Sequence, residues 1–245
     1  MRKFGWLAVA MMATVFSFAA LAEDPKPAPP PDPDEIAQDQ MLGQVVDLLK
    51  QNHMPDVLTL LDKMNARADE KIKADGRRAY TARTSPESLL YLLQAANEKA
   101  PNGAVVYHVV WSEGYFLKGF VLNGAGQAAV AEPWLQRALA MAPMNSQYLL
   151  ELGNLYTRQR NWPAALDYFH KAEEASRVYA PDNLKNGDLG KAWRGTGYVL
   201  VEQNKLDEAE KVYRQCLDVN PNDQRAANEI KYVRSLKDKN ATAKP

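Results

Sequence analysis

The chain has 245 residues, 46% of them hydrophobic, which is enough to bury the core of one large or two small domains. Its 30 basic and 30 acidic side chains cancel, and this argues against nucleic-acid binding and against attachment to an anionic membrane by charge. The single cysteine, Cys216, excludes an intrachain disulfide, and none of the three histidines has a second His or Cys at zinc-ligand spacing. The sequence therefore predicts neither a metal site nor a cofactor.

The first 22 residues have the layout of a secretory signal peptide. Arg2 and Lys3 precede a long uncharged run, and a small-x-small triplet predicts cleavage after Ala22. The alternative is an uncleaved membrane anchor, because residues 4–22 are just long enough to span a bilayer. Cleavage is the favoured interpretation, and it predicts a periplasmic or secreted protein without stable membrane insertion.

A proline-rich segment follows at residues 23–34, and it predicts an extended linker because proline lacks the backbone donor and fixes φ. Residues 35–111 show apolar side chains at helical spacing, interrupted by turn signals such as Met54-Pro55 and Asn102-Gly103. We therefore expect helical hairpins without a repeat signature in this region. The end of the region, residues 104–111, is expected to lead into the repeats that follow.

The second half of the chain repeats itself, with an offset of 34 residues between the first two copies and 44 between the second and third. The recurring positions are Gly119, Gly153 and Gly197; Ala131, Ala165 and Ala209; Leu135, Phe169 and Tyr213; and Ala138, Ala172 and Cys216. Small residues let two helices approach closely, and the bulky residue fills the space between neighbouring hairpins. The pattern predicts a stack of antiparallel hairpins in which Cys216 is buried and unreactive.

This pattern resembles the tetratricopeptide repeat (TPR). Copies are assigned to residues 112–145, 146–189 and 190–223, and the third has the family's signature residues at Trp193, Gly197, Ala209, Tyr213 and Pro221. The second copy lacks a closing proline, so residues 179–187 are expected to form an extra loop. Residues 224–237 have the spacing of a capping helix, and residues 238–245 that of a flexible tail. The resemblance implies an all-α, right-handed superhelical array of hairpins, a TPR solenoid, that ends in this capping helix.

The resemblance also implies that this exported bacterial protein binds another protein or a peptide and is not an enzyme. In TPR arrays the first helix of each hairpin lines a concave groove that holds a partner segment. The groove residues predicted on this basis are Glu113, Phe116, Phe120, Gln147, Asn154, Arg158, Lys191, Arg194 and Tyr198. Asn154 can hydrogen-bond a peptide backbone, and Lys191 and Arg194 can hold a carboxylate.

Two other functions stay open on the sequence alone. The protein could be a permanent subunit of an envelope assembly that docks through its convex face or through the 179–187 loop. An envelope enzyme is disfavoured because no catalytic motif is present. Its sign would be a compact polar pocket with strongly perturbed acids.

Overall fold

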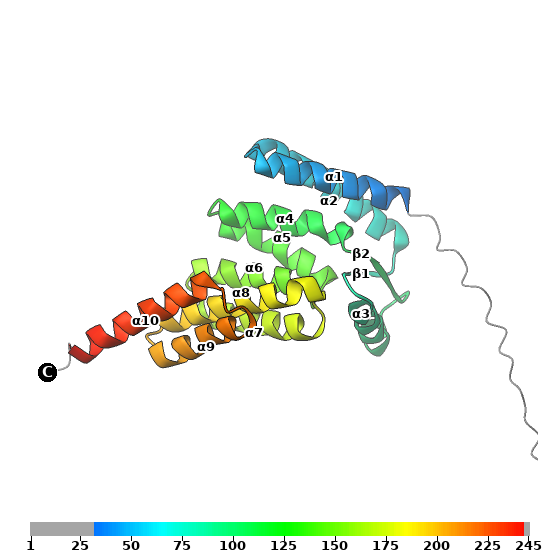
Figure 1. Cartoon of the computed structure of the whole chain (residues 1–245). Helices are drawn as coiled ribbons and strands as arrows, with labels where there is room; N and C mark the ends of the chain where they lie inside the picture. The colour runs from blue at the N-terminus through cyan, green and yellow to red at the C-terminus, as the bar shows by residue number, and fades with distance from the viewer. Residues whose placement is uncertain (1–31, 243–245) are drawn as a thin grey trace, which may run out of the picture. The chain divides into compact units, whose positions relative to one another are not determined.

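The computed structural model describes residues 32–242 (Figure 1), so the signal peptide, most of the proline-rich linker and the last three residues lie outside the described residues. The elements are α1 (Pro33–Lys50), α2 (Met54–Asp75), β1 (Arg78–Ala82), α3 (Ser85–Asn97), β2 (Ala104–His108), α4 (Val110–Gly124), α5 (Ala128–Met141), α6 (Ser146–Arg158), α7 (Trp162–Val178), α8 (Asp182–Glu202), α9 (Leu206–Val219) and α10 (Gln224–Thr242). Within residues 32–242, no helix combines the length and the hydrophobicity that a bilayer-spanning segment needs.

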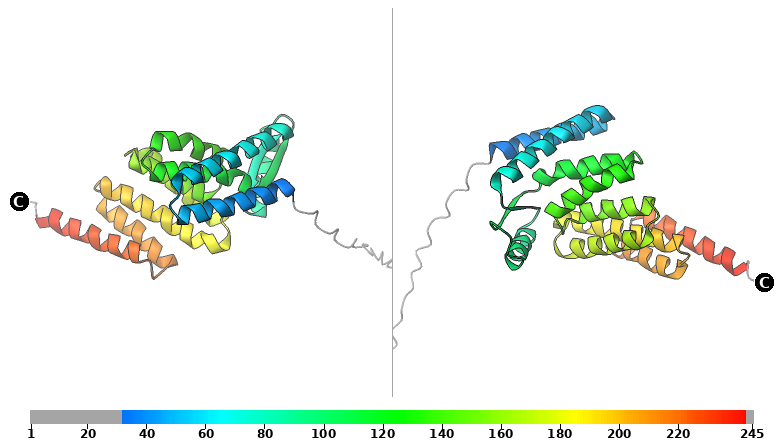
Figure 2. Two further views of the ribbon diagram at one scale, coloured as in Figure 1. Left: turned by 90° about the horizontal axis from the view of Figure 1, so that it is seen from above. Right: turned by 180° about the vertical axis from the view of Figure 1, so that it is seen from behind.

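Apart from α3, the helices of residues 32–242 form four antiparallel hairpins and a final single helix. The pairs are α1 with α2, α4 with α5, α6 with α7 and α8 with α9, and α10 packs on α9. Successive hairpins contact one another in chain order, as the views of Figure 2 also show: α1 and α2 pack on α4, α5 on α6, and α7 on α8. The predicted all-α array of helical hairpins with a C-terminal capping helix is therefore confirmed.

The small residues of the repeat are the sites of closest helix contact. A Cβ atom added at Gly119 would lie 2.5 Å from Cγ of Leu135, and one added at Gly197 would lie 2.6 Å from Cζ of Tyr213. At Gly153 the added atom would lie 2.5 Å from Cε1 of Phe169. Real Cβ atoms do not approach a non-bonded heavy atom so closely. Glycine at these positions therefore allows the two helices of each hairpin to pack at this distance.

The hairpin of the third repeat copy, α8 with α9, begins earlier than the repeat pattern indicates. α8 starts at Asp182, after Pro181 in an extended conformation, so the expected loop at residues 179–187 is wrong and only residues 179–181 connect α7 to α8. The extra turns of α8 are held by packing, because Leu189 is buried in one cluster with Trp193 and Cys216. Cys216 is buried as predicted, and burial raises the pKa of its thiol to about 11.

Residues 78–108 do not form a helical hairpin, contrary to the expectation for the N-terminal third. β1 and β2 pair in parallel, from Arg78 opposite Ala104 to Ala82 opposite His108, and α3 connects them and packs on both. Stacking of the Tyr80 and Tyr91 rings, 5.2 Å apart, fixes α3 against β1. Pairing between strands separated by a helix leaves no local periodicity, which is why the sequence did not reveal this β1–α3–β2 unit.

Two end boundaries also differ from expectation. α1 starts at Pro33, inside the predicted linker, because Asp32 caps it by accepting a hydrogen bond of 2.9 Å from the backbone N–H of Asp34. At the other end, α10 extends through residues 238–242, where a flexible tail was expected. The described part of the tail is therefore helical.

The glycine contacts give a first prediction. Gly153→Ala should lower the free energy of unfolding by about 1–3 kcal/mol, because the new methyl group must displace the Phe169 ring. Gly43→Ala is the matched control: Gly43 is exposed inside α1, with no atom within 4 Å of an added Cβ, and alanine there should stabilise by up to about 1 kcal/mol. Denaturant unfolding of both variants measures this, and equal effects would contradict the packing role of Gly153.

Candidate functional site

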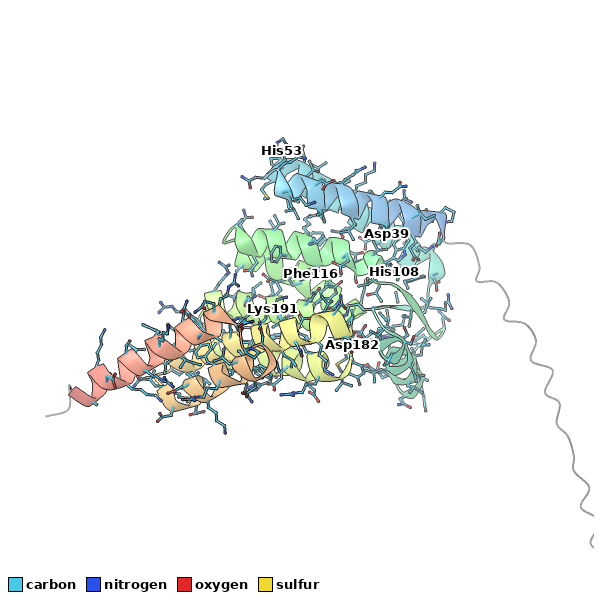
Figure 3. The ribbon with its side chains drawn as sticks, in the orientation of Figure 1. Asp39, His53, His108, Phe116, Asp182 and Lys191 are labelled. Carbon is cyan, nitrogen blue, oxygen red and sulfur yellow. The ribbon has the colours of Figure 1, made fainter. Side chains whose placement is uncertain are left out.

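The predicted groove residues lie on α4, α6 and α8, the first helices of three successive hairpins, which pack side by side. Figure 3 labels Phe116 on α4 and Lys191 on α8, two levels apart in this row of helices. The exposed members of the set are Phe120, Asn154, Arg158, Lys191 and Tyr198, and the half-buried members are Glu113, Phe116, Gln147 and Arg194.

A cleft of about 480 Å³ lies where α6, α8 and α10 face one another. Four predicted groove residues line it: Asn154, Lys191, Arg194 and Tyr198. The residues of α10 that also line the cleft were not predicted from the sequence; they are Arg225, Asn228 and Glu229. The signal was available, because adding the repeat offset of 34 to positions 191 and 194 gives positions 225 and 228. The capping helix therefore occupies the place of the next groove helix.

Two cations that line the cleft form ion pairs with buried acids. Lys191 Nζ donates to Asp188 Oδ1 at 3.1 Å, and Arg194 forms an ion pair with Asp223. The remaining oxygens of these acids are also used: Ser146 Oγ donates to Asp188 Oδ2 at 2.7 Å, and the N–H of Ala226 donates to Asp223 Oδ1 at 3.0 Å. The surface of the cleft therefore presents the spare N–H donors of the cations, while the carboxylates point inward.

Arg225 is the third cation of the cleft and has no ion-pair partner within residues 32–242. A neighbouring cleft of about 630 Å³ shares all three cations and extends past the first turns of α8 and α10, including Gly187 and Gln224. The three cations thus lie between two adjoining clefts, where one bound segment can contact all three.

Asn154 is oriented by a polar contact on its own helix. Its Nδ2 donates to Glu151 Oε2 at 3.3 Å, and Asn123 Nδ2 of α4 donates to the other oxygen at 2.6 Å. Burial raises the pKa of Glu151, while these hydrogen bonds and the charge of Arg158 oppose the rise. One N–H and the carbonyl oxygen of Asn154 stay available to a peptide backbone. Gln147 and Arg158 do not line the cleft.

Aromatic side chains dominate the α4 end of the same helix row. The Phe116 ring stacks on Tyr148, with centroids 4.7 Å apart, and lies 6.1 Å from the ring of Phe120, which is 44% exposed. Beside them, Glu113 Oε1 accepts a hydrogen bond of 3.2 Å from Tyr148 Oη. Burial raises the pKa of Glu113 to about 7, although Tyr148 and the charge of Arg83 lower it. This perturbed acid does not line the α6–α8–α10 cleft.

A buried polar network connects the β1–α3–β2 unit to the groove. Arg83 pairs with Glu87 at 2.8 Å and donates to Ser146 Oγ at 3.3 Å, and Ser146 in turn bonds Asp188 beneath Lys191. The side chains of Arg83 and Glu87 are 8% and 1% exposed. The partners that bury Arg83 are distant in the sequence, so no local pattern predicts this network.

Comparison with known proteins places α6 to α9 within a known repeat. Residues 145–222, which include α6 to α9, match the family model described as tetratricopeptide repeat. The structure of PilF from Pseudomonas aeruginosa is similar over 85% of this chain and 72% of that chain, with 13% identity and a TM-score of 0.58. No curated protein sequence matches the chain.

Two further solved structures are more distant in shape. MamA of AMB-1 is 16% identical over 85% of this chain and 93% of that chain, with a TM-score of 0.48. The first TPR of RPAP3, bound to an HSP90 peptide, is 22% identical over 51% of this chain and 91% of that chain, with a TM-score of 0.44. The repeat match and the likeness to PilF therefore support the fold of the chain.

Glu113 gives a prediction on pH dependence. The fold raises the pKa of this carboxyl from 4.5 to about 7, so the folded chain keeps a proton that the unfolded chain releases. The contribution of the Glu113 carboxyl to the free energy of unfolding is therefore greatest below about pH 4.5. It falls as the pH rises to about 7 and is constant above that pH. Glu113→Gln should stabilise the protein by roughly 1–3 kcal/mol at pH 8 and by little at pH 4.5, because the amide has no charge to desolvate.

Denaturant unfolding at both pH values measures the effect. Glu208→Gln is the control, because Glu208 is an exposed side chain on α9. Equal pH dependence in the wild type and in Glu113→Gln would show that burial does not hold the proton on this carboxyl.

Proposed function

We propose that this chain, whose repeat match and fold support the tetratricopeptide repeat family, binds a segment of another protein in the groove formed by α6, α8 and α10. One observation carries the proposal: Asn154, Lys191, Arg194 and Tyr198 come from two separate hairpins, yet they line one cleft with the capping helix. Concave faces of helical repeat arrays are their usual binding surfaces. The TPR fold also supports a role in protein–protein interaction rather than catalysis.

The chemistry of the cleft suits a polypeptide segment. Asn154 offers both a donor and an acceptor to a peptide backbone, and Tyr198, which is 45% exposed, offers an aromatic surface to an apolar side chain. Lys191, Arg194 and Arg225 offer charged donors to carboxylates. Residues of α6, α8 and α10 line the cleft, and a second cleft along α8 and α10 adjoins it, which fits an extended or helical segment better than a compact small molecule.

We place this activity in the cell envelope. The support is the sequence of residues 1–22, which has the features of a cleaved export signal. The partner would then be an envelope protein or a secreted protein. Retention of residues 4–22 as a membrane anchor is the alternative, and it would keep the groove next to the membrane.

A permanent structural role in an envelope assembly is the less favoured function. One of the two docking elements expected for it, the 179–187 loop, is mostly the first turns of α8. The convex face, formed by the second helices of the hairpins, remains as the other. The groove has charged and aromatic side chains that converge on one cleft, so we favour it as the binding surface.

Variants of the cleft test the proposed groove. Tyr198→Ala and Arg225→Ala should each weaken partner binding tenfold or more, as expected for side chains at the centre of an interface. A photo-crosslinking amino acid at position 154 in living cells first identifies the partner, and titration of the purified partner segment then measures affinity. Arg160→Ala, in the turn after α6, is the exposed control and should bind as the wild type does. Unchanged affinity in both cleft variants would exclude this groove.

The expected location is tested by the N-terminus of the protein isolated from cells. It should begin at Glu23, and Ala22→Arg should block the processing because the cleavage site requires a small residue. N-terminal sequencing of soluble and membrane fractions gives the answer. A chain that keeps residues 1–22 and sediments with membranes would establish the anchor instead.

A further inference from the structure

We infer that the binding groove is bipartite: an aromatic end on α4 takes apolar side chains, and a cationic end on α8 and α10 takes carboxylates of the same partner segment. This inference rests on the proposed function and names the chemistry of the partner. It follows from how the side chains change along equivalent positions of the four groove helices.

The repeat offsets define three rows of equivalent positions across α4, α6, α8 and α10. The rows are Glu113, Gln147, Lys191 and Arg225; Phe116, Leu150, Arg194 and Asn228; and Phe120, Asn154, Tyr198 and Tyr232. All members of these rows on α6, α8 and α10 line the 480 Å³ cleft, except Gln147 and Tyr232. Because the hairpins repeat, we assign Glu113, Phe116 and Phe120 of α4 to the same face, as a continuation of the groove beyond the cleft.

The first two rows change in charge from one end to the other. α4 presents Glu113 and Phe116, α6 presents only uncharged side chains, and the cations stand on α8 and α10. The third row is aromatic at both ends, with Phe120 on α4 and Tyr198 and Tyr232 on α8 and α10. The carboxylates that neutralise Lys191 and Arg194 are 1% and 9% exposed, so they lie beneath the cations. Glu229 is the one acid in the lining of the cleft, against three cations.

The aromatic end is less negative than its composition suggests. Glu113 is its single acid in the three rows, and burial keeps this carboxyl partly protonated near neutral pH. The Phe120 ring is 44% exposed and is supported from behind by Phe116, which itself stacks on Tyr148 of α6. An exposed ring on a fixed aromatic base is suited to an apolar anchor of a partner.

Helix spacing sets the separation of the two ends. Packed helices lie about 8–10 Å apart, so α4 is roughly 16–20 Å from α8, and α10 stands beyond α8 in the same row. An extended chain advances about 3.3 Å per residue. The partner segment should therefore carry its apolar and acidic side chains about five or more residues apart.

Designed peptides test this arrangement. The first has a Phe-Leu pair, a six-residue Ser/Asn spacer and three Asp residues, and it is made in both chain directions. The comparison peptides have the same pair and acids with no spacer, the acids alone with the spacer, and the pair alone with the spacer. Fluorescence anisotropy with the chain from residue 23 onward measures each affinity. We expect the spaced peptide, in one direction, to bind at least tenfold tighter than any of the other three.

Variants assign each half of the peptide to its end of the groove. Phe120→Ala should weaken the spaced peptide at least fivefold and leave the acids-only peptide unchanged, and Arg225→Ala should weaken both. Val130→Ala, an exposed apolar side chain on α5, is the matched control for Phe120. Equal binding of the spaced and unspaced peptides, or no effect of Phe120→Ala, would overturn the bipartite groove. If no peptide binds, the bipartite groove is also overturned, whereas the groove function stands or falls by the crosslinking experiment.

Discussion

The spacing of the groove helices depends on the ring of Phe169. This side chain of α7 fills the space left by two glycines, Gly153 on α6 and Gly195 on α8, and an added Cβ at either would collide with it. This one aromatic ring thus contacts two neighbouring groove helices. The next residue on α6 is Asn154 and the preceding one on α8 is Arg194, and both line the cleft to which Phe169 also contributes. The packing that holds the array together therefore also sets the geometry of the cleft.

The sequence predicted the parts of the fold that depend on local repetition. Glycine, alanine and a large side chain at fixed offsets describe contacts within a hairpin and between adjacent hairpins, so positions such as Gly197 and Tyr213 identified the array. The missed features depend on distant partners. Asp188 is buried because Ser146 and Lys191 satisfy its oxygens, and this buried acid anchors the turns of α8 that the repeat pattern assigned to a loop. The parallel pairing of Arg78–Ala82 with Ala104–His108 is non-local in the same way.

The sequence predicted a groove on the first helices of the hairpins, but only some of the residues that line the cleft. Asn154, Lys191, Arg194 and Tyr198 meet in one cleft, because the first helix of every hairpin turns the same face outward. Arg225 was missed, although it stands at the position equivalent to Lys191, because the capping helix lacks the small-residue signature that marked the other copies. Glu113 was predicted as a groove side chain, but its nearest partner is Tyr148, and its raised pKa reflects burial against α6. The repeat offset could have identified Arg225, whereas the burial of Glu113 could not be deduced from spacing alone.

The buried acids beneath the cleft decide what kind of recognition it can perform. A chain with zero net charge exerts little long-range attraction, and each of Lys191 and Arg194 already has a counter-charge close by. These cations therefore add little to the rate of encounter, and the field they produce fades within a few ångströms. Their remaining donors act at contact distance, where hydrogen-bond geometry matters more than charge. Arg83 adds a further buried contact, because its hydrogen bond to Ser146 fixes the hydroxyl oxygen that donates to Asp188. A buried chain of polar contacts, rather than net charge, thus determines where Lys191 points, and with it which carboxylates the groove can select.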